Sequence, residues 1–185
     1  RELKKIKDFQ VRFNKKLNDG IYVGGQDVST FEESVTNYIG SKYCVAVNSG
    51  TDALLLSLIA LGIKKGDKII VPSFTFFATI EVVMHLGAVP VFVDINTETY
   101  TIDIDDFKKK VNKTIKAVIP VHLFGNNSNI NQIKNICKEY NIKIIEDVAQ
   151  AFGSGTENNT KLGSIGDIGA FSFFPSKTLG GIGDG

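Results

Sequence analysis

An alternation between short apolar runs and helical segments begins at residue 43 and constrains the fold more than any other feature. Apolar runs bounded by turn residues predict strands, and they cover residues 43–47, 68–72, 89–94, 116–121, 142–147 and 168–174. Apolar residues at helical spacing predict helices over residues 51–62, most of 74–87, 104–111 and 129–140. Strands that are apolar on both faces need cover on both sides. The sequence therefore predicts an α/β fold with a mostly parallel sheet covered by helices on both faces.

Two more helices are predicted before this alternation. The first is amphipathic, because apolar residues recur at helical spacing at Leu3, Ile6, Phe9, Phe13 and Leu17. A turn-rich connection follows over residues 18–27. Ser29 and Thr30 then precede acidic residues, a pattern typical of a helix start, and we expect this second helix to end near Gly40.

Composition excludes several classes of function. Hydrophobic residues make up 43% of the chain and charged residues 22%, with a net charge of +1, so nothing indicates a nucleic-acid partner. We expect no membrane association, because no apolar run is long enough to cross a bilayer and the start lacks a signal-peptide pattern. Cys44 and Cys137 lie far apart and predict thiols in a reducing compartment, the cytoplasm. With His85 and His122 as the histidines, we expect no metal site.

The two ends of the sequence suggest a larger protein. The chain starts without methionine and stops inside the glycine-rich stretch GGIGDG. We expect residues 1–185 to be the N-terminal part of a longer protein.

Ligands of parallel α/β sheets bind at the carboxyl ends of the strands, which directs attention to the loops there. Ser49, Gly50 and Thr51 lie where a strand gives way to a helix, and free backbone N–H groups at a helix start favour an anion. Gly50 also allows close approach of the backbone. The simpler alternative is that Ser49 or Thr51 caps the helix, and capping is the commoner use of such residues.

Two further loops carry ionisable groups. Glu146 and Asp147 end a very apolar strand, where a carboxylate must be solvated, paired or functional. Asp147 could bind a protonated ring nitrogen, as in pyridoxal-phosphate sites, or it could cap a helix. Lys177 follows the last predicted strand, where an apolar environment would favour a nucleophilic amine. The alternative for Lys177 is an ordinary solvated lysine.

Taken together, these loops supply a partner for each part of pyridoxal phosphate. They offer an anion cradle, a carboxylate, aromatic rings in the stretch PSFTFF, the Ser172 hydroxyl and the Lys177 amine. Other cofactors fit less well. The chain lacks the G-x-G-x-x-G turn of nicotinamide sites, the P-loop of NTPases and the G-x-S-x-G elbow of hydrolases.

The order of these motifs resembles the DegT/DnrJ/EryC1/StrS family of pyridoxal-phosphate-dependent aminotransferases. The resemblance rests on NSGTDALLLSLIALGIKKGDKIIVPSFTFFAT, GAVPVFVDI, IPVHLFG, IIEDVAQAFGS and GDIGAFSFFPSKTLGGIGDG, and it extends from IYVGGQDVSTFEESVTNYIG onward. It implies the fold of the large domain of type I aminotransferases. Residues 1–185 would then be the N-terminal part of this pyridoxal-phosphate-binding domain, and the rest of it and a smaller C-terminal domain would lie outside this sequence. It also implies transfer of an amino group, from glutamate, to a nucleotide-linked keto-sugar for amino sugar and polysaccharide biosynthesis. A homodimer is implied as well, because in this family a second subunit completes the phosphate site.

The resemblance also implies residue roles. Lys177 would hold the cofactor aldehyde covalently and then move a proton between substrate and cofactor. Asp147 would pair with the pyridinium nitrogen, and Gln150 would contact the phenolic oxygen side of the ring. Phe76 would stack on the ring face. The phosphate would be held by Gly50, Thr51 and Ser172.

The sequence departs from the family pattern at one position and leaves alternatives open. Thr178 follows the lysine where the family usually has asparagine, which puts in doubt the contact that this asparagine makes. Lys177 itself argues against the family branch that has histidine there and dehydrates its substrate. His122 matches the family but receives no role, since a hydrogen-bonded structural histidine explains it as well. The alternatives to a sugar aminotransferase are another pyridoxal-phosphate enzyme, a non-catalytic relative and an inactive fragment.

Overall fold

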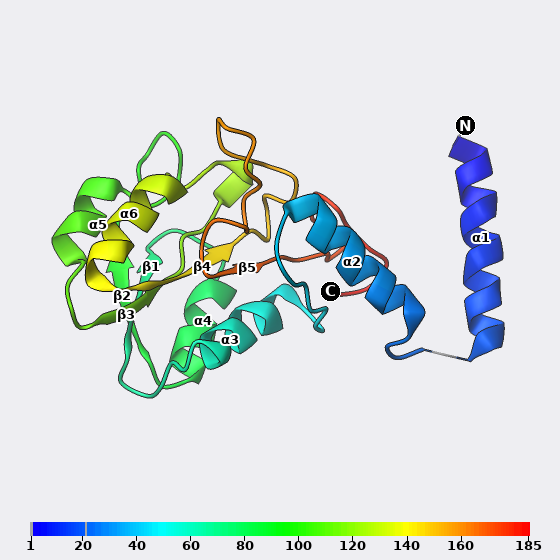
Figure 1. Cartoon of the computed structure of the whole chain (residues 1–185), viewed down its shortest axis with the longest axis horizontal. Helices are drawn as coiled ribbons and strands as arrows, with labels where there is room; N and C mark the ends of the chain where they lie inside the picture. Colours follow the sequence, from blue (N-terminus) through cyan, green and yellow to red (C-terminus); the bar gives the residue numbers. More distant parts are fainter. Residues whose placement is uncertain (1, 21) are drawn as a thin grey trace. The chain divides into compact units, whose positions relative to one another are not determined.

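The structure, a computed structural model, describes residues 2–20 and 22–185 and divides into two compact units. The first unit holds residues 1–38 and 42–46, and the second holds residues 39–41 and 47–185. The first unit contains the two predicted N-terminal helices, α1 (Glu2–Asp19) and α2 (Gln26–Ile39) (Figure 1). The side chains of Leu3 and Ile6 lie outside the described part of the chain, as does Ile21 in the connection.

The start of α2 was predicted too late, because the prediction placed Ser29 and Thr30 before the helix. The helix begins at Gln26, and the backbone N–H of Ser29 already donates to Gly25 O at 3.3 Å. Gly24 and Gly25 take positive φ values of 66° and 83°, a turn that lets the helix begin directly after them. The predicted end is confirmed, since Gly40 takes a φ of 79° just after Ile39, as glycines that terminate helices commonly do.

The prediction of a strand over residues 43–47 is wrong. Tyr43 and Val45 are 74% and 77% exposed, and no strand is assigned to this segment. The backbone N–H of Ala46 donates to Glu32 Oε1 at 2.8 Å instead of to a neighbouring strand. A strand exists only through its ladder of backbone hydrogen bonds, and the described residues supply no such ladder here.

The second unit is built on a five-stranded parallel sheet in the order β2-β1-β3-β4-β5. This confirms the predicted parallel sheet. Its strands are β1 (Lys68–Pro72), β2 (Val89–Val93), β3 (Ile115–Val118), β4 (Lys143–Asp147) and β5 (Ile168–Ala170). The helices are α3 (Gly50–Ala60), α4 (Ala78–His85), α5 (Ile104–Lys110) and α6 (Ile130–Tyr140), with a short 3-10 turn, η1, at Leu123–Gly125.

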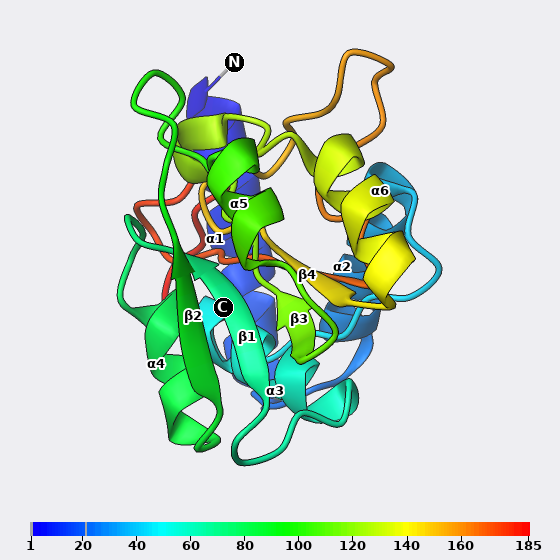
Figure 2. The same ribbon diagram turned by 90° about the vertical axis from the view of Figure 1, so that its left-hand side faces the viewer.

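Helices cover both faces of this sheet, as the apolar strands predicted. Figures 1 and 2 show α5 and α6 on one face and α3 and α4 on the other. The alternation within β1 explains this, because Ile70 packs in the cluster with Phe107 of α5 and Ile133 of α6. Its neighbours Ile69 and Val71 pack in a second cluster, which includes Leu58, Val82 and Val83 from α3 and α4. Successive side chains of a strand point to opposite faces, so one apolar strand supplies two cores.

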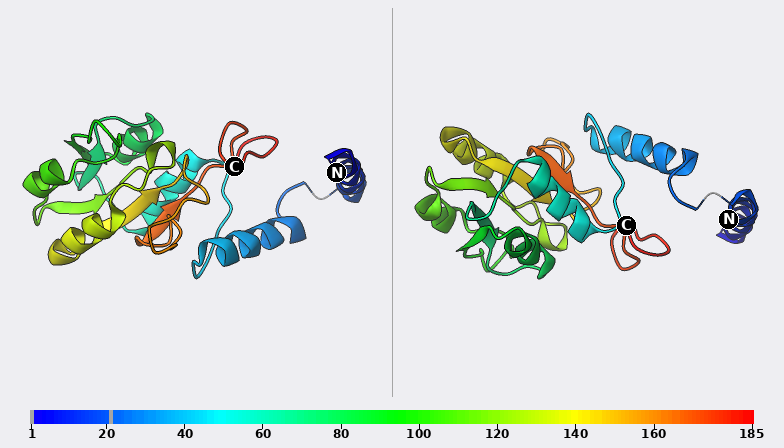
Figure 3. Two further views of the ribbon diagram at one scale, coloured as in Figure 1. Left: turned by 90° about the horizontal axis from the view of Figure 1, so that it is seen from above. Right: turned by 90° about the horizontal axis from the view of Figure 1, so that it is seen from below.

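Three elements are clearly shorter than predicted. β3 ends at Val118, before Pro120, although Ile119 N still donates to Ile70 O at 2.9 Å. α4 begins only at Ala78, after a turn that carries the aromatic residues 74–77. β5 stops at Ala170, four residues early, because Phe173 exchanges backbone hydrogen bonds with Gly181 and Gly185 rather than with a strand. Figure 3 shows this last segment, in red, leaving the sheet.

No helix among the described residues is both long and apolar enough for a membrane span. The same part of the chain contains no cluster of three or more His, Cys, Asp or Glu side chains suited to a metal ion.

Candidate active site

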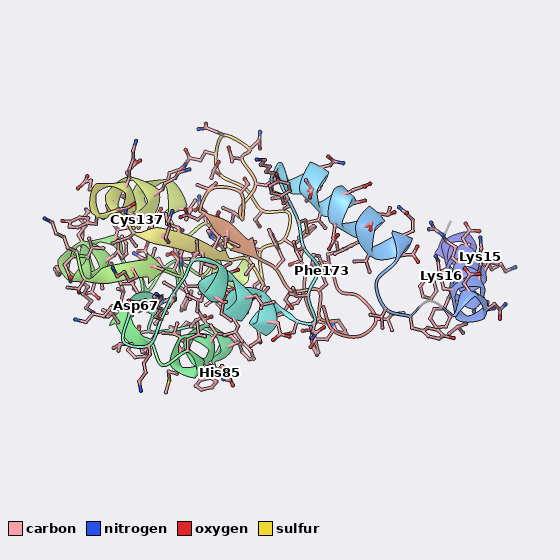
Figure 4. The ribbon with its side chains drawn as sticks, turned by 60° about the horizontal axis from the view of Figure 1, so that its bottom comes forward. Lys15, Lys16, Asp67, His85, Cys137 and Phe173 are labelled. Carbon is pink, nitrogen blue, oxygen red and sulfur yellow. The ribbon has the colours of Figure 1, made fainter. Side chains whose placement is uncertain are left out.

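A cavity of about 380 Å³ opens at the carboxyl edge of the sheet. Its walls come from the start of α3 and from the segments that follow β1, β3, β4 and β5. All seven residues to which the resemblance assigned a role toward the cofactor line it: Gly50, Thr51, Phe76, Asp147, Gln150, Ser172 and Lys177. His85 and Cys137 lie elsewhere, and Figure 4 places them on α4 and α6, toward the opposite end of the sheet from Phe173. The strand-end rule therefore located the cavity from sequence.

The start of α3 serves as a cap and also as part of the cavity wall. Ser49 has an extended backbone, and its side chain accepts a hydrogen bond from Asp52 N at 3.1 Å, so the capping alternative is confirmed for Ser49. Gly50 and Thr51 form the first turn beside the cavity. Backbone N–H groups in a first turn lack partners within the helix and carry the positive end of its dipole. Capping by Ser49 and anion binding by this turn are therefore compatible.

Glycine at position 50 permits a close approach between α3 and the segment after β5. A Cβ added to Gly50 would lie 2.8 Å from Ser172 Cβ and 3.3 Å from the Phe171 carbonyl oxygen. Any side chain at residue 50 would push these two segments apart. The approach brings the hydroxyl of Ser172, a 7% exposed residue, next to the helix start. Backbone donors and a hydroxyl in one corner form a cradle suited to a phosphate group.

Asp147 is buried at the end of β4 and is held by two hydrogen bonds. Its Oδ2 accepts from the Thr79 hydroxyl at 2.9 Å, and its Oδ1 accepts from Ala149 N at 3.1 Å. Burial raises the pKa of Asp147, and these two hydrogen bonds and the nearby His122 and Lys177 only partly offset the effect. The helix-capping alternative is wrong, because a turn rather than a helix follows β4. A cation placed against this carboxylate would stabilise its charged form.

Lys177 and Phe76 face the cavity from two loops. The backbone N–H of Lys177 donates to Phe174 O at 2.8 Å, which forms a turn and sets where the side chain leaves the loop. The Nζ atom of Lys177 lies 5.9 Å from the centroid of the Phe76 ring. Lys177 is partly buried and lines the cavity.

Gln150 is oriented by a backbone contact. Its Oε1 accepts a hydrogen bond from Phe124 N at 3.1 Å. Because the carbonyl end of the amide is engaged in this way, the Nε2 atom is the end that can donate to a ligand in the cavity. An acceptor such as a phenolic oxygen suits that arrangement.

Glu146, the neighbour of Asp147, supports the site from behind and does not line the cavity. Its fully buried carboxylate accepts backbone hydrogen bonds from Gly163, Ile165 and Gly166 at 2.7–2.9 Å. His122 Nε2 lies 3.1 Å from Glu146 Oε2. Since Nδ1 of His122 accepts from Ser128 N at 3.2 Å, Nε2 carries the proton and donates to Glu146. The structure therefore agrees with the structural alternative for His122.

These contacts connect Glu146 to the phosphate corner. The loop that it holds packs tightly on the segment after β5, since a Cβ on Gly163 would clash with the ring of Phe171. Phe171 precedes Ser172, whose side chain lies against Gly50. Burial alone would raise the pKa of Glu146, but hydrogen bonds from His122, Gly166 and Gly163 outweigh it and hold the pKa below its ordinary value.

Replacement of Glu146 with Gln is expected to destabilise the protein by about 3 kcal/mol, because an amide NH₂ would face donors and leave a buried group without a partner. The unfolding midpoint in urea measures this loss, and exposed Glu139→Gln is the matched control. Since its pKa is lowered on folding, the Glu146 carboxylate stabilises the fold above its ordinary pKa and loses this effect as pH falls through the folded pKa. An unchanged midpoint in Glu146→Gln would show that the three backbone bonds do not depend on the charge.

Sequence reasoning missed Thr75 and Thr79. Thr79 is 1% exposed and donates to Asp147, while Thr75 lines the cavity with its Oγ1 3.2 Å from that of Thr79. Thr75 lies in the stretch PSFTFF, which was searched only for aromatic rings, and Thr79 lies two residues beyond it. Two threonines four residues apart near a helix start were the sequence pattern that could have indicated these two site residues.

Comparison with known proteins agrees with this geometry. A sequence model of the DegT/DnrJ/EryC1/StrS aminotransferase family matches residues 4–185, and the chain belongs to this family. The chain is 44% identical over 171 residues to UDP-N-acetyl-3-dehydro-alpha-D-glucosamine 3-aminotransferase from Acidithiobacillus ferrooxidans, covering 92% of the chain and 46% of that protein. It is 39% identical over 170 residues to GDP-perosamine synthase from Vibrio cholerae, covering 89% and 46%.

The fold is shared with solved members of the family. The crystal structure of NtdA from Bacillus subtilis with bound cofactor PMP superposes with a TM-score of 0.90 at 35% identity, covering 98% of this chain and 40% of that one. The predicted likeness to the α/β fold of aminotransferases is therefore confirmed. The chain spans about half the length of the curated relatives it matches.

Proposed function

We propose that this protein is a pyridoxal-phosphate-dependent aminotransferase that transfers an amino group from glutamate to a nucleotide-linked keto-sugar. The observation that carries the proposal is the convergence of seven residues from four separate segments on one cavity. Membership of an aminotransferase family and similarity to proteins named for UDP- and GDP-linked sugars support the substrate class. PMP, the amine form of pyridoxal phosphate, is named with a solved relative and supports the cofactor.

The residues of the cavity fit each part of this cofactor. The cradle at Gly50, Thr51 and Ser172 would bind the phosphate, since it joins helix N–H groups to a hydroxyl. Asp147 would bind the protonated ring nitrogen, which would stabilise the charged form that burial disfavours. Bound there, the cofactor supplies a carbonyl that takes up the amino group and a ring that withdraws electrons from the reacting carbon.

The remaining residues would hold the ring and move the proton. Phe76 would cover one ring face, and Gln150 Nε2 would donate to the phenolic oxygen. Lys177 Nζ would hold the aldehyde end of the cofactor and would be the amine that moves a proton to and from the reacting carbon. Apolar neighbours such as Leu54, Val121 and Leu123 would limit access of water to this amine.

We extend the proposal to the organisation of the protein. Residues 1–185 would form the N-terminal part of a cofactor-binding large domain, with a smaller domain following it. The protein would act in the cytoplasm as a homodimer, because a second subunit would complete the phosphate site. Light scattering of the full-length protein tests the dimer by its mass in solution.

The experiment for the function combines the full-length protein with glutamate and a panel of UDP-, GDP- and dTDP-linked keto-sugars. We expect one keto-sugar to become an amino sugar with an equal amount of 2-oxoglutarate. Formation of neither product across the panel would defeat the proposal. Conversion of an amino acid by decarboxylation or racemisation would instead show another pyridoxal-phosphate enzyme, and cofactor binding without turnover would show a non-catalytic relative.

Thr79→Val is expected to weaken pyridoxal phosphate binding about tenfold, because Asp147 loses a buried hydrogen bond to its charged form. Loss of this donor raises the pKa of Asp147 further, so the acid limit of cofactor binding should move to higher pH. Thr79→Ser keeps the hydroxyl and serves as the control. Equal cofactor affinity in the Val and Ser variants, measured by equilibrium titration, would contradict a role for Thr79 in orienting Asp147.

A further inference from the structure

Three exposed aromatic side chains form a contiguous cluster near the cavity. Phe74, Tyr100 and Phe124 follow β1, β2 and β3, and we call them the aromatic ledge. The ring centroids of Phe74 and Tyr100 are 5.9 Å apart, and those of Tyr100 and Phe124 are 6.0 Å apart with an edge-on angle of 78°. The three residues are 50%, 43% and 64% exposed. The chain therefore brings three rings together and leaves them open to a partner.

The backbone at two of these residues is strained. Tyr100 and Phe124 have φ values of 59° and 56°, in the left-handed region that disfavours large side chains. Hydrogen bonds hold both conformations: Tyr100 N donates to Asn96 O at 2.8 Å, and Phe124 N donates to Gln150 Oε1 at 3.1 Å. Because both rings remain exposed, burial of these side chains does not offset the strain. Backbone strain that is not offset by side-chain burial commonly marks a functional position.

The ledge adjoins the cavity through its own backbone. Thr75 and Leu123, the direct neighbours of Phe74 and Phe124, both line the cavity. Gln150 lines it too, and it is the acceptor for the Phe124 N–H. A ligand that extends out of the cavity past Gln150 therefore reaches the ledge.

The size of the cavity indicates which part of a ligand reaches that far. A volume of about 380 Å³ is near the lower end of the range of small-molecule sites, roughly 300–1,000 Å³. The cofactor and a reacting sugar ring would fill such a space, so the nucleotide of a nucleotide-linked sugar must lie outside it. Every nucleobase presents a flat π face that stacks on aromatic side chains, whichever base it is.

On this basis, and resting on the proposed function, we propose that the aromatic ledge is the stacking subsite for the base of the nucleotide-linked sugar. The subsite would accept different bases with modest preference, because stacking reads the π face rather than the hydrogen-bonding edge. A second copy of the chain is the competing occupant. Three half-exposed aromatic side chains offer roughly 300 Å² in total, well below the roughly 800 Å² that each partner contributes to a stable interface.

The test compares leucine variants of the full-length, cofactor-loaded protein, since leucine keeps apolar volume and removes the π face. For Tyr100→Leu and Phe124→Leu we expect a KM for the keto-sugar nucleotide roughly tenfold higher, and a larger rise for this substrate than for glutamate. Calorimetry with UDP alone should show a similar loss of affinity. Phe124→Tyr keeps an aromatic ring and should have the wild-type KM and the wild-type affinity for UDP. Tyr140→Leu is the matched control, because Tyr140 is a partly exposed tyrosine of α6 away from the cavity.

The outcomes separate this inference from the proposed function. If the wild-type protein aminates no keto-sugar, the proposed function fails. If it does so and the leucine variants keep the wild-type KM and UDP affinity, the ledge is not the base subsite. If the leucine variants have half the mass of the wild-type protein in solution and bind UDP as tightly as it does, the ledge contacts a second copy of the chain and the inference is overturned. A variant that does not fold is replaced by Phe74→Leu, whose backbone lies outside the left-handed region.

Discussion

Lys177→Ala is expected to lose transaminase activity by about 10³-fold or more, because it removes both the amine that would attach the cofactor and the group that would move the proton. The loss should fall on kcat for both the glutamate and the keto-sugar half-reactions, since each needs the same proton transfer. Stopped-flow spectroscopy of the bound cofactor measures the two halves separately.

Two companion variants distinguish amine chemistry from charge in this test. Lys177→Arg keeps a cation near Phe76 but cannot act as a neutral nucleophile, so we expect it to be as inactive as Lys177→Ala. Lys138→Ala removes an exposed lysine of α6 and should behave as wild type. Substantial activity in Lys177→Arg would show that the position supplies positive charge only.

Asp147→Asn is expected to lower activity by about 10²-fold or more and to weaken cofactor binding, because an amide cannot neutralise a protonated ring nitrogen. The size and position of the side chain are nearly unchanged, so the loss reports the charge. Measured kcat and the dissociation constant of pyridoxal phosphate give the two effects. If Asp147→Asn has the wild-type kcat and the wild-type dissociation constant, Asp147 does not bind the ring nitrogen.

The same variant should have the opposite effect on the stability of the protein without cofactor. Burial raises the pKa of Asp147 in the folded state, so ionisation costs folding free energy at pH values above the folded pKa. That cost is absent below the ordinary aspartate pKa, where the group is protonated in both states. At pH 7 the cofactor-free Asp147→Asn protein should therefore unfold at a higher temperature than wild type. A lower melting temperature would show that the ionised carboxylate stabilises the cofactor-free fold, which contradicts this prediction.

The fold could be predicted where the relevant pattern is local. The apolar runs of β1 and β4 and the helical spacing of α6 each specify an element within a few residues. Residues 43–47 show the limit of such patterns. Their apolar character favours a strand, but a strand also needs a partner, and the backbone there bonds to Glu32 instead. The end of β5 was overestimated for the same reason, because Phe173 bonds to the glycine-rich loop.

The site was predictable to the extent that topology brings strand ends together. The rule for parallel sheets placed Asp147, Ser172 and Lys177 at one edge, and all three line the cavity. Contacts between distant segments could not be anticipated. Thr79 and Asp147 are separated by 68 residues, and no sequence pattern pairs a helix threonine with a strand carboxylate. The contact of Phe124 with Gln150, which joins the cavity to the aromatic ledge, is of the same kind.

The central claim is that the amine of Lys177 holds pyridoxal phosphate between Asp147 and the start of α3. Borohydride reduction of the cofactor-loaded full-length protein fixes the cofactor permanently to the amine that carries it, and peptide mass mapping then locates the adduct. The account predicts a single pyridoxyl group on the peptide that contains Lys177. An adduct on another lysine, or no adduct in protein that retains the cofactor, would contradict it.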